Sequence, residues 1–497
     1  MTASDDVRLS AAEAGALHQS VHGLFEGQPN MSAAVTVTRG QRVALLGALA
    51  VVVAALVLWP RQAGVTLVAL AMVMYLSNLT DRVMLFSRGV GSAPEIAVTD
   101  DEARAIADDD LPLYTVFVPA FDEPEVVTRL IHSLGALDYP DDKLDVQLLL
   151  EADDDKTVSL AYEGLRSGVL RANIVLVPAA DPRTKPKACN YGLQFARGAF
   201  ATIYDAEDLP EPLQLRRAVV AFGRLPHQVA CIQAKLSYHN DRQNLLTRWF
   251  TSEYNQWFGY ILPGLMTTDS PIPLGGTSNH IRTDVLQGVG GWDPYNVTED
   301  ADLGIRLARA GYRTAVLESV TLEEANSDPI NWLRQRSRWY KGYLQTFLVH
   351  TRQPRRVWKE LGPRGFLRFC SITAGTPIIS VVNTFFWGLT LAWELGEPSF
   401  IRVLFPPWLF YPAMMSLFFG NAAMIYCGLV AARMDRNPRL LGACLLVPAY
   451  WVLMSVAAIK AFVQLVFQPS YWEKTVHGLD GRADDDELVG SGIVVSP

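Results

Sequence analysis

Cysteine is scarce in this sequence and forms no pattern. The five cysteines among the 497 residues stand at positions 189, 231, 370, 427 and 444, far from one another along the chain. This spacing predicts neither a disulfide framework nor a cysteine metal site. It is typical of proteins in a reducing compartment.

Two further features are missing. No apolar run occurs before Val43, and the preceding residues are polar and acidic, so no cleavable signal peptide is expected. The chain also lacks an excess of positive charge, since its formal net charge is −8. We therefore expect no nucleic-acid partner.

Charged residues make up only 19% of the chain, whereas hydrophobic residues make up 50%. Stretches almost free of charge lie at 45–59, 65–79, 372–393, 407–432 and 440–467. Each approaches or exceeds the ~20 apolar residues that a membrane-spanning helix needs. The sequence therefore predicts a multi-pass membrane protein with a large polar insert, and the bilayer is an expected partner.

The predicted domains follow from this division. They are a polar N-terminus at 1–40 that is disordered or loosely helical, a transmembrane hairpin at 41–88, an α/β domain at 100–327, interfacial amphipathic helices at 328–370, transmembrane or interfacial helices at 371–468, and a gating-like segment and tail at 469–497. Arg39 and Arg42 precede the hairpin, and Arg82 and Arg88 follow it. Because positive residues favour the cytoplasmic side, we expect the α/β domain at the cytoplasmic face of the inner membrane.

The last apolar stretch, 440–467, allows two interpretations. If it spans the bilayer, the tail lies outside the cell. Pro448, Lys460 and Gln464 interrupt it, which favours an interfacial or re-entrant helix and a cytoplasmic tail.

Within 100–327, apolar strands at 114–118, 146–150, 174–177 and 199–204 alternate with helical segments. This alternation predicts a Rossmann-like, mostly parallel sheet with helices on both faces. Ligands of such sheets bind beyond the carboxyl ends of the strands. Successive strands here end on Phe121-Asp122-Glu123, on Asp153-Asp154 and on Asp205-Ala206-Glu207, so we expect a binding site at that edge.

Asp205 and Glu207 are two residues apart at a strand end, and their side chains therefore point the same way. Two such carboxylates can hold Mg²⁺ or Mn²⁺ and leave room for a phosphate. A solvated acidic turn is the alternative for this segment taken alone.

Further segments follow in a fixed order. They are Lys185-Pro186-Lys187, Gly275-Gly276-Thr277-Ser278-Asn279-His280, Val297-Thr298-Glu299-Asp300, Gln335-Arg336-Ser337-Arg338-Trp339 and Pro469-Ser470-Tyr471-Trp472. With the acidic strand ends, they make residues 115–478 resemble the membrane-integrated family 2 glycosyltransferases, the group of cellulose, hyaluronan and mannan synthases. The resemblance implies a GT-A fold inserted between α-helical transmembrane segments.

The resemblance also implies roles for single residues. Nucleotide-sugar contacts are expected from Phe121, Glu123, Asp153, Asp154, Lys187, Asp205, Trp472 and Lys474, and metal binding from Asp205 and Glu207. Because Glu207 takes the place of the family's second aspartate, either Glu207 or Asp208 can be the second ligand. Catalysis is expected to involve Asp300, Glu299, Gln335, Arg338 and Trp339, and the acceptor is expected near Thr277, Ser278, His280 and Trp339. A carboxylate such as Asp300 can remove the proton from an acceptor hydroxyl, and a metal with cationic side chains can neutralise a departing diphosphate.

We accordingly expect inverting transfer of a sugar from a nucleotide sugar, of the UDP-glucose or GDP-mannose type, to a growing polysaccharide that is exported. The alternative is a non-processive enzyme that makes a membrane glycolipid. A non-enzymatic transport subunit is a third possibility, which the complete set of acidic residues disfavours. Because few helices would form a thin channel, a second copy or an accessory subunit is a further expected partner.

Overall fold

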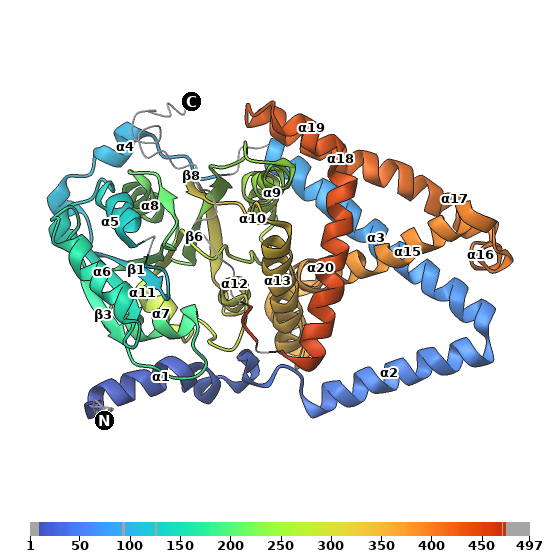
Figure 1. The fold of residues 1–497 in the computed structure, drawn as a ribbon, viewed down its shortest axis with the longest axis horizontal. Helices are drawn as coiled ribbons and strands as arrows, with labels where there is room; N and C mark the ends of the chain where they lie inside the picture. Colours follow the sequence, from blue (N-terminus) through green and yellow to red (C-terminus); the bar gives the residue numbers. More distant parts are fainter. Residues whose placement is uncertain (1–8, 92–94, 125–126, 470, 474–497) are drawn as a thin grey trace.

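The computed structural model describes residues 9–91, 95–124, 127–469 and 471–473. An eight-stranded sheet with the order β3-β2-β1-β4-β7-β6-β8-β5 lies at the centre of the α/β domain (Figure 1). Its strands are β1 Tyr114–Ala120, β2 Leu144–Glu151, β3 Asn173–Val177, β4 Phe200–Ile203, β5 Leu209–Pro210, β6 Val229–Tyr238, β7 Asn279–Arg282 and β8 Arg313–Glu323.

The sheet is mostly parallel, as the sequence predicts. Strands β3, β2, β1 and β4 run parallel, β7 is antiparallel to both neighbours, and β6 pairs in parallel with β8. Side chains of β1 alternate between two cores, with Val116 and Val118 in one and Phe117 in the other. Because a parallel strand is covered on both faces, this alternation requires apolar residues at successive positions.

Helices cover both faces of the sheet. Those of the domain are α4 Asp100–Arg104, α5 Val127–Gly135, α6 Asp155–Leu165, α7 Lys185–Leu193, α8 Gln214–Arg224, α9 Leu245–Gln256, α10 Leu262–Thr267, α11 Thr283–Gly288 and α12 Glu299–Arg309. Outside it lie α1 Ala11–Gly27, α2 Arg39–Leu58, α3 Pro60–Gly91, α13 Pro329–His350, α14 Pro354–Cys370, α15 Thr376–Gly396, α16 Ser399–Leu404, α17 Pro407–Met415, α18 Asn421–Met434, α19 Leu440–Leu445 and α20 Val447–Phe467.

Of the two states expected for residues 1–40, disordered or loosely helical, the structure shows a helix, α1, over Ala11–Gly27. Helix α1 begins with a capping box between Ser10 and Glu13 and buries Val21 and Leu24. Asn190 on α7 donates to the carbonyl oxygen of Ser20 over 3.1 Å. The Ser-x-x-Glu pattern is a helix-start signal, so the sequence contained the information that the composition obscured.

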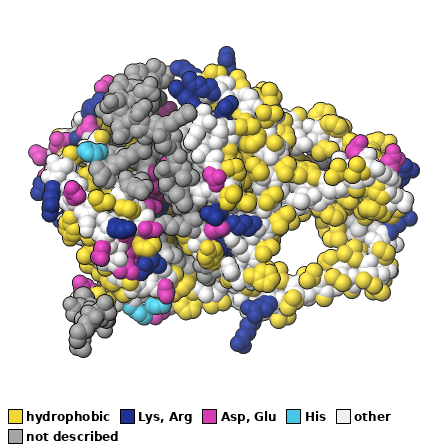
Figure 2. Space-filling view, in the orientation of Figure 1, with side chains coloured by type: hydrophobic (Ala, Val, Ile, Leu, Met, Phe, Trp, Pro, Cys, Tyr) yellow, Lys and Arg dark blue, Asp and Glu magenta, His cyan; other side chains and the backbone are white. Residues whose placement is uncertain are grey.

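Five helical segments among the described residues are long and apolar enough to cross a membrane. They are Arg39–Leu58, Pro60–Gly91, Pro354–Gly396, Pro407–Met434 and Val447–Phe467. Helices α2, α3, α15 and α17 extend away from the α/β domain on one side, where hydrophobic side chains cover most of the visible surface (Figures 1 and 2).

Helix α20 is placed differently from the other apolar helices. It runs beside α13 and across the direction of α3 and α15 (Figure 1). Near its start, Tyr450 lies 3.2 Å from Arg336 of α13; just after its end, the carbonyl oxygen of Pro469 accepts a 2.8 Å bond from Gln345 of α13. Its length and composition suit a membrane span, and it contacts α13 near both of its ends.

Gly304 in α12 sits where no side chain fits. A Cβ atom there would lie 2.1 Å from the carbonyl oxygen of Ile272, and backbone cannot move aside cheaply. We expect Gly304→Ala to lower the free energy of unfolding by about 1–3 kcal/mol or more, the usual effect of overpacking. The measurement is thermal and denaturant unfolding of the purified protein followed by tryptophan fluorescence.

Gly223→Ala is the matched control. Gly223 is also helical, but a Cβ atom there meets nothing within 4 Å. Because alanine is the better helix former, this variant should gain up to about 1 kcal/mol. Equal stability of the two variants would contradict the packing described for α12.

Candidate active site

The loop after β4 presents two carboxylates to a cavity and uses a third to hold its own shape. Asp205 and Glu207 line the cavity, whereas Asp208 is only 1% exposed. The Asp208 carboxylate accepts a 2.7 Å bond from the amide of Asp205 and a bond from the Thr277 hydroxyl. Burial, with repulsion from Asp205 and Glu207, raises the pKa of Asp208 well above its usual value. Glu207 rather than Asp208 is therefore the second carboxylate that faces the cavity.

The lysine at this site is Lys185 and not the predicted Lys187. The Lys185 ammonium contacts Asp205 and donates to the carbonyl oxygen of Gly276 over 2.8 Å. Lys187 is fully buried, where it donates to Glu151 over 2.9 Å. Positions two apart on a helix point about 200° away from each other, so α7 can direct only one of these lysines to the cavity.

Lys185 is held in its charged form. Burial alone lowers the pKa of this ammonium, but Asp205 and Glu299 outweigh burial and raise the pKa above its usual value. A permanently charged lysine beside Asp205 provides the positive charge that a diphosphate needs.

Helix α12 brings Glu299 and Asp300 to the same place through its first turn. A Cβ atom on Gly276 would lie 3.4 Å from Asp300 Oδ2 and 3.9 Å from Lys185 Nζ, so these groups converge on one glycine. Burial is the main reason why the pKa of Glu299 rises to about 8, and Asp300 adds to it. Burial also raises the pKa of Asp300, which Lys185 partly offsets. A carboxylate with a raised pKa is a stronger base toward an acceptor hydroxyl.

Helix α13 carries Gln335, Arg338 and Trp339 to the opposite wall of the cavity. Arg338 lies 4.8 Å from the centre of the Trp472 ring and donates to the carbonyl oxygen of Glu473 over 3.4 Å. The Trp339 ring stacks on the Tyr254 ring, with their centres 5.9 Å apart and an angle of 24° between their planes. The structure thus brings Trp472 to the site as predicted, whereas Lys474 lies outside the described residues.

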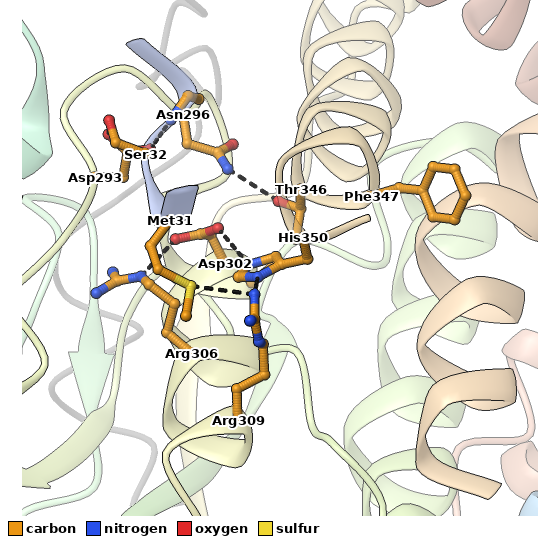
Figure 3. Close-up of polar contacts among 12 residues, drawn as sticks. Met31, Ser32, Asp293, Asn296, Asp302, Arg306, Arg309, Thr346, Phe347 and His350 are labelled. Carbon is orange, nitrogen blue, oxygen red and sulfur yellow. Dashed lines mark hydrogen bonds and ion pairs between the residues drawn. The ribbon is translucent and has the colours of Figure 1, made fainter. Parts of the chain in front are cut away.

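A buried polar cluster that the sequence did not reveal fixes α12 against α13 (Figure 3). Asp302 accepts from Arg306 over 2.7 Å and lies 3.0 Å from His350 Nε2. Asn296 donates to Thr346 over 2.9 Å. Burial tends to raise the pKa of Asp302, but Arg306 and His350 bring it below its usual value. These contacts hold the turn that carries Asp300 in register with the helix that carries Trp339.

Some of the expected nucleotide-binding residues line the cavity, whereas others form contacts within the protein. Phe121 and Glu123 line the cavity after β1, and Arg183, which the sequence reading missed, lies 5.0 Å from the Phe121 ring centre. Asp153 pairs with Arg183 at 2.5 Å. Asp154 caps α6 by accepting from the amide of Thr157 over 3.2 Å, so its carboxylate serves the fold.

Two of the expected acceptor contacts are wrong in this structure. Ser278 and His280 are both fully buried, because they belong to β7 and the turn before it, in the interior of the sheet. The Ser278 hydroxyl lies 2.7 Å from that of Thr321, and His280 Nδ1 lies 2.7 Å from the Tyr114 hydroxyl. Thr277 does reach the cavity wall, although its hydroxyl donates to the carbonyl oxygen of Ile203 over 2.9 Å.

The cavity has a volume of about 1880 Å³ and extends from these carboxylates to the apolar helices. Its other walls come from α3, α15, α17, α18, α20 and the segments that flank α17, and include Met72, Phe386, Phe405, Phe410, Leu417, Met424 and Trp451. One continuous space therefore joins a charged end in the α/β domain to an apolar end among the membrane helices.

Asp205 and Glu207 fit a hard divalent cation as two carboxylate ligands. No cluster of three or more histidine, cysteine or acidic side chains suited to a metal occurs among the described residues. Mg²⁺ and Mn²⁺ sites in phosphate-transferring enzymes commonly use one or two carboxylates and take further oxygens from the substrate. The pair therefore suits a cation that arrives with a phosphate.

Comparison with known proteins agrees with this arrangement. The family described as "Glycosyltransferase like family 2" matches residues 112–342. A probable glycosyltransferase of Bacillus subtilis, YdaM, is 26% identical over 47% of this chain, which spans 56% of that protein's length. The beta-monoglucosyldiacylglycerol synthase of Synechocystis is 25% identical over 76% of this chain and 77% of its own length.

A solved structure has the same fold. The mannosyltransferase PcManGT from Pyrobaculum calidifontis, in complex with GDP-Man and Mn²⁺, superposes with a TM-score of 0.50 and 19% identity, covering 81% of this chain and 99% of that one. The mixed, mostly parallel sheet is thus of the GT-A type. The likeness to this structure shows the fold, and the family match is to residues 112–342, a little under half of the chain.

Proposed function

We propose that the protein transfers a sugar from a nucleotide sugar to the hydroxyl group of a membrane lipid, with inversion at the anomeric carbon. The observation that carries this proposal is the single cavity, which joins Asp205 and Asp300 to apolar walls among the membrane helices. A nucleotide sugar suits the charged end. Hydrocarbon chains suit the apolar end.

The reaction exchanges one bond at the anomeric carbon for another. The acceptor oxygen forms a bond to that carbon as its bond to the diphosphate oxygen breaks, and Asp300 takes the acceptor proton. Asp205 and Glu207 would hold a Mg²⁺ or Mn²⁺ ion, which supplies charge neutralisation to the leaving diphosphate when bound. Lys185 and Arg338 add positive charge on the protein side. Direct displacement with a single base inverts the configuration.

The walls of the cavity favour a lipid over a sugar polymer. A polysaccharide chain carries many hydroxyl groups, and burying them against apolar side chains without hydrogen bonds is costly. Phe386, Phe405 and Leu417 offer no such bonds, but they match acyl chains. The similarity to a glucosyldiacylglycerol synthase, which covers most of both chains, supports the same choice.

Extension of a polysaccharide is the second candidate, and Trp339 and Trp472 are its support. Both rings line the cavity near the carboxylates, and aromatic faces commonly stack on sugars. The Trp339 ring, however, already contacts Tyr254 and lies 4.6 Å from the Arg336 guanidinium. Export of a polymer would require a wider passage, for which a second copy or an accessory subunit is a reasonable source.

We place the reaction at the cytoplasmic face of the inner membrane. Arg39, Arg42, Arg82 and Arg88 flank the first hairpin, and positive residues favour that side. Nucleotide sugars are available there.

The carboxylates should separate into binding and turnover roles. We expect Asp205→Ala and Glu207→Ala to abolish metal-dependent binding of nucleoside diphosphate. Asp300→Asn should keep binding and lower kcat by about 10²–10⁴-fold, because a base acts in the transition state. Calorimetry gives the binding, and release of nucleoside diphosphate gives kcat. Loss of binding in Asp300→Asn would contradict the assignment.

Lys185 and Lys187 form a matched pair for a second test. Lys185→Met should leave the melting temperature near that of the wild type and lower kcat/KM by about 10²–10³-fold, as expected for loss of an electrostatic stabiliser. Lys187→Met leaves Glu151 buried without its main partner, so we expect a loss of about 3–5 kcal/mol in stability. The reverse pattern would restore Lys187 as the diphosphate-binding lysine.

Analysis of the product distinguishes a lipid acceptor from a polysaccharide acceptor. Purified protein in lipid vesicles with a radiolabelled nucleotide sugar, of the UDP-glucose or GDP-mannose type, and Mn²⁺ should yield one organic-soluble glycolipid. A ladder of sugar lengths, or a polymer that resists lipid extraction, would favour the polysaccharide candidate instead. Absence of turnover with every donor would contradict the enzymatic assignment.

A further inference from the structure

Helix α3 presents one continuous stripe of side chains to the cavity. Its lining residues recur at intervals of three and four and are Val68, Ala71, Met72, Tyr75, Asn78, Leu79, Arg82 and Phe86. This spacing places them on one face of the helix. Arg82 is the charged member of an otherwise uncharged stripe.

Among the residues that the structure describes, none forms a hydrogen bond or an ion pair with Arg82, although the neighbours of Arg82 are paired. Asp81 accepts from Arg368 over 3.1 Å, and Arg336, which also lines the cavity, donates to Glu253 over 2.9 Å. A guanidinium cannot lose its proton at ordinary pH, and in a largely apolar cavity it requires an anion.

Arg82 of α3 and Tyr343 of α13 line the same cavity. Burial raises the pKa of Tyr343, the negative charge of Asp300 raises it further, and the positive charge of Arg82 lowers it. The Tyr343 hydroxyl therefore lies within electrostatic reach of both Asp300 and Arg82, and all of them line the same space.

Apolar side chains that suit hydrocarbon line the same cavity. Phe410 and Leu417 are among them and are 43% and 41% exposed. A lipid could thus place its chains between α3 and α17 while its polar end points toward Asp300.

We propose that Arg82 binds the phosphate of an anionic phospholipid whose hydroxylated headgroup is the acceptor. The proposal rests on the function proposed above and narrows it from lipids in general to phosphate-bearing lipids. Arginine matches a phosphate with paired N–H donors and keeps its charge in apolar surroundings. A phosphate held there would leave the headgroup hydroxyl on the side of Asp300, with the chains in the apolar end.

The kinetic test uses the full chain in neutral detergent micelles with Mn²⁺ and the nucleotide sugar that it turns over. Phosphatidylglycerol supplies a phosphate and hydroxyl groups, and diacylglycerol supplies a hydroxyl without phosphate. We expect wild type to prefer phosphatidylglycerol. Arg82→Gln should raise KM for phosphatidylglycerol by about 10–100-fold, the range for a lost charge-assisted hydrogen bond, without changing KM for the nucleotide sugar. Arg82→Lys should be intermediate.

Arg61→Gln is the matched control, since Arg61 lies on the same helix, is exposed and is not part of the cavity wall. It should behave as wild type. Equal use of both lipids by wild type, or an unchanged KM for phosphatidylglycerol in Arg82→Gln, would overturn the proposal.

A binding measurement keeps this test separate from the proposed function. Trp387, Trp393 and Trp451 line the apolar end, so brominated phosphatidylglycerol bound there should quench tryptophan fluorescence. We expect tighter quenching than with brominated diacylglycerol, and a loss of that difference in Arg82→Gln. Inorganic phosphate at millimolar concentration should compete only weakly, because it lacks the chains. If no donor is turned over but this difference persists, the proposed function fails and the phosphate site stands. Equal quenching by both lipids overturns the site.

Discussion

The crowding of carboxylates at one edge of the sheet is the constraint on which the rest of the structure depends. Asp205 and Glu207 lie beside the buried Asp208, and Glu299 and Asp300 face them from α12. Burial, with repulsion between the carboxylates, raises the pKa of Asp208, Glu299 and Asp300. Lys185 lowers the pKa of Glu299 and Asp300 in turn. Under the function proposed above, a bound cation would add the positive charge that a diphosphate needs beside these carboxylates.

Helix α13 connects the carboxylate site to the segment that follows α20. A Cβ atom on Gly342 would lie 2.3 Å from the Thr298 hydroxyl, so only glycine allows α13 to approach the turn before α12 so closely. Gln345 accepts from the amide of Val297 over 3.2 Å and also donates to the carbonyl oxygen of Pro469. One side chain thus joins the segment that carries Asp300 to the segment that carries Trp472.

The two ends of the cavity differ in polarity. Its charged end carries Asp205, Glu207 and Asp300, and its other end is lined mainly by apolar side chains, with Asn383, Ser380 and Asn421 among them. Under the function proposed above, an amphipathic acceptor would place its polar part near Asp300 and its chains among the apolar side chains. Arg82, which lines the same cavity, is where we propose that an acidic headgroup binds.

The sequence by itself determined the class of fold, the edge of the sheet that carries the site, and the roles of Asp205, Glu207, Asp300 and Trp339 as residues facing it, because strand period and motif order are local properties. It named Lys187 where the structure brings Lys185 to the cavity, and it left Glu207 and Asp208 open, since both choices depend on the direction in which α7 and the loop after β4 are packed. It also placed Ser278 and His280 at the acceptor, although pairing within the sheet buries both. The surroundings of Arg82 and the extent of the cavity depend on helices distant in sequence, and only tertiary packing brings those together.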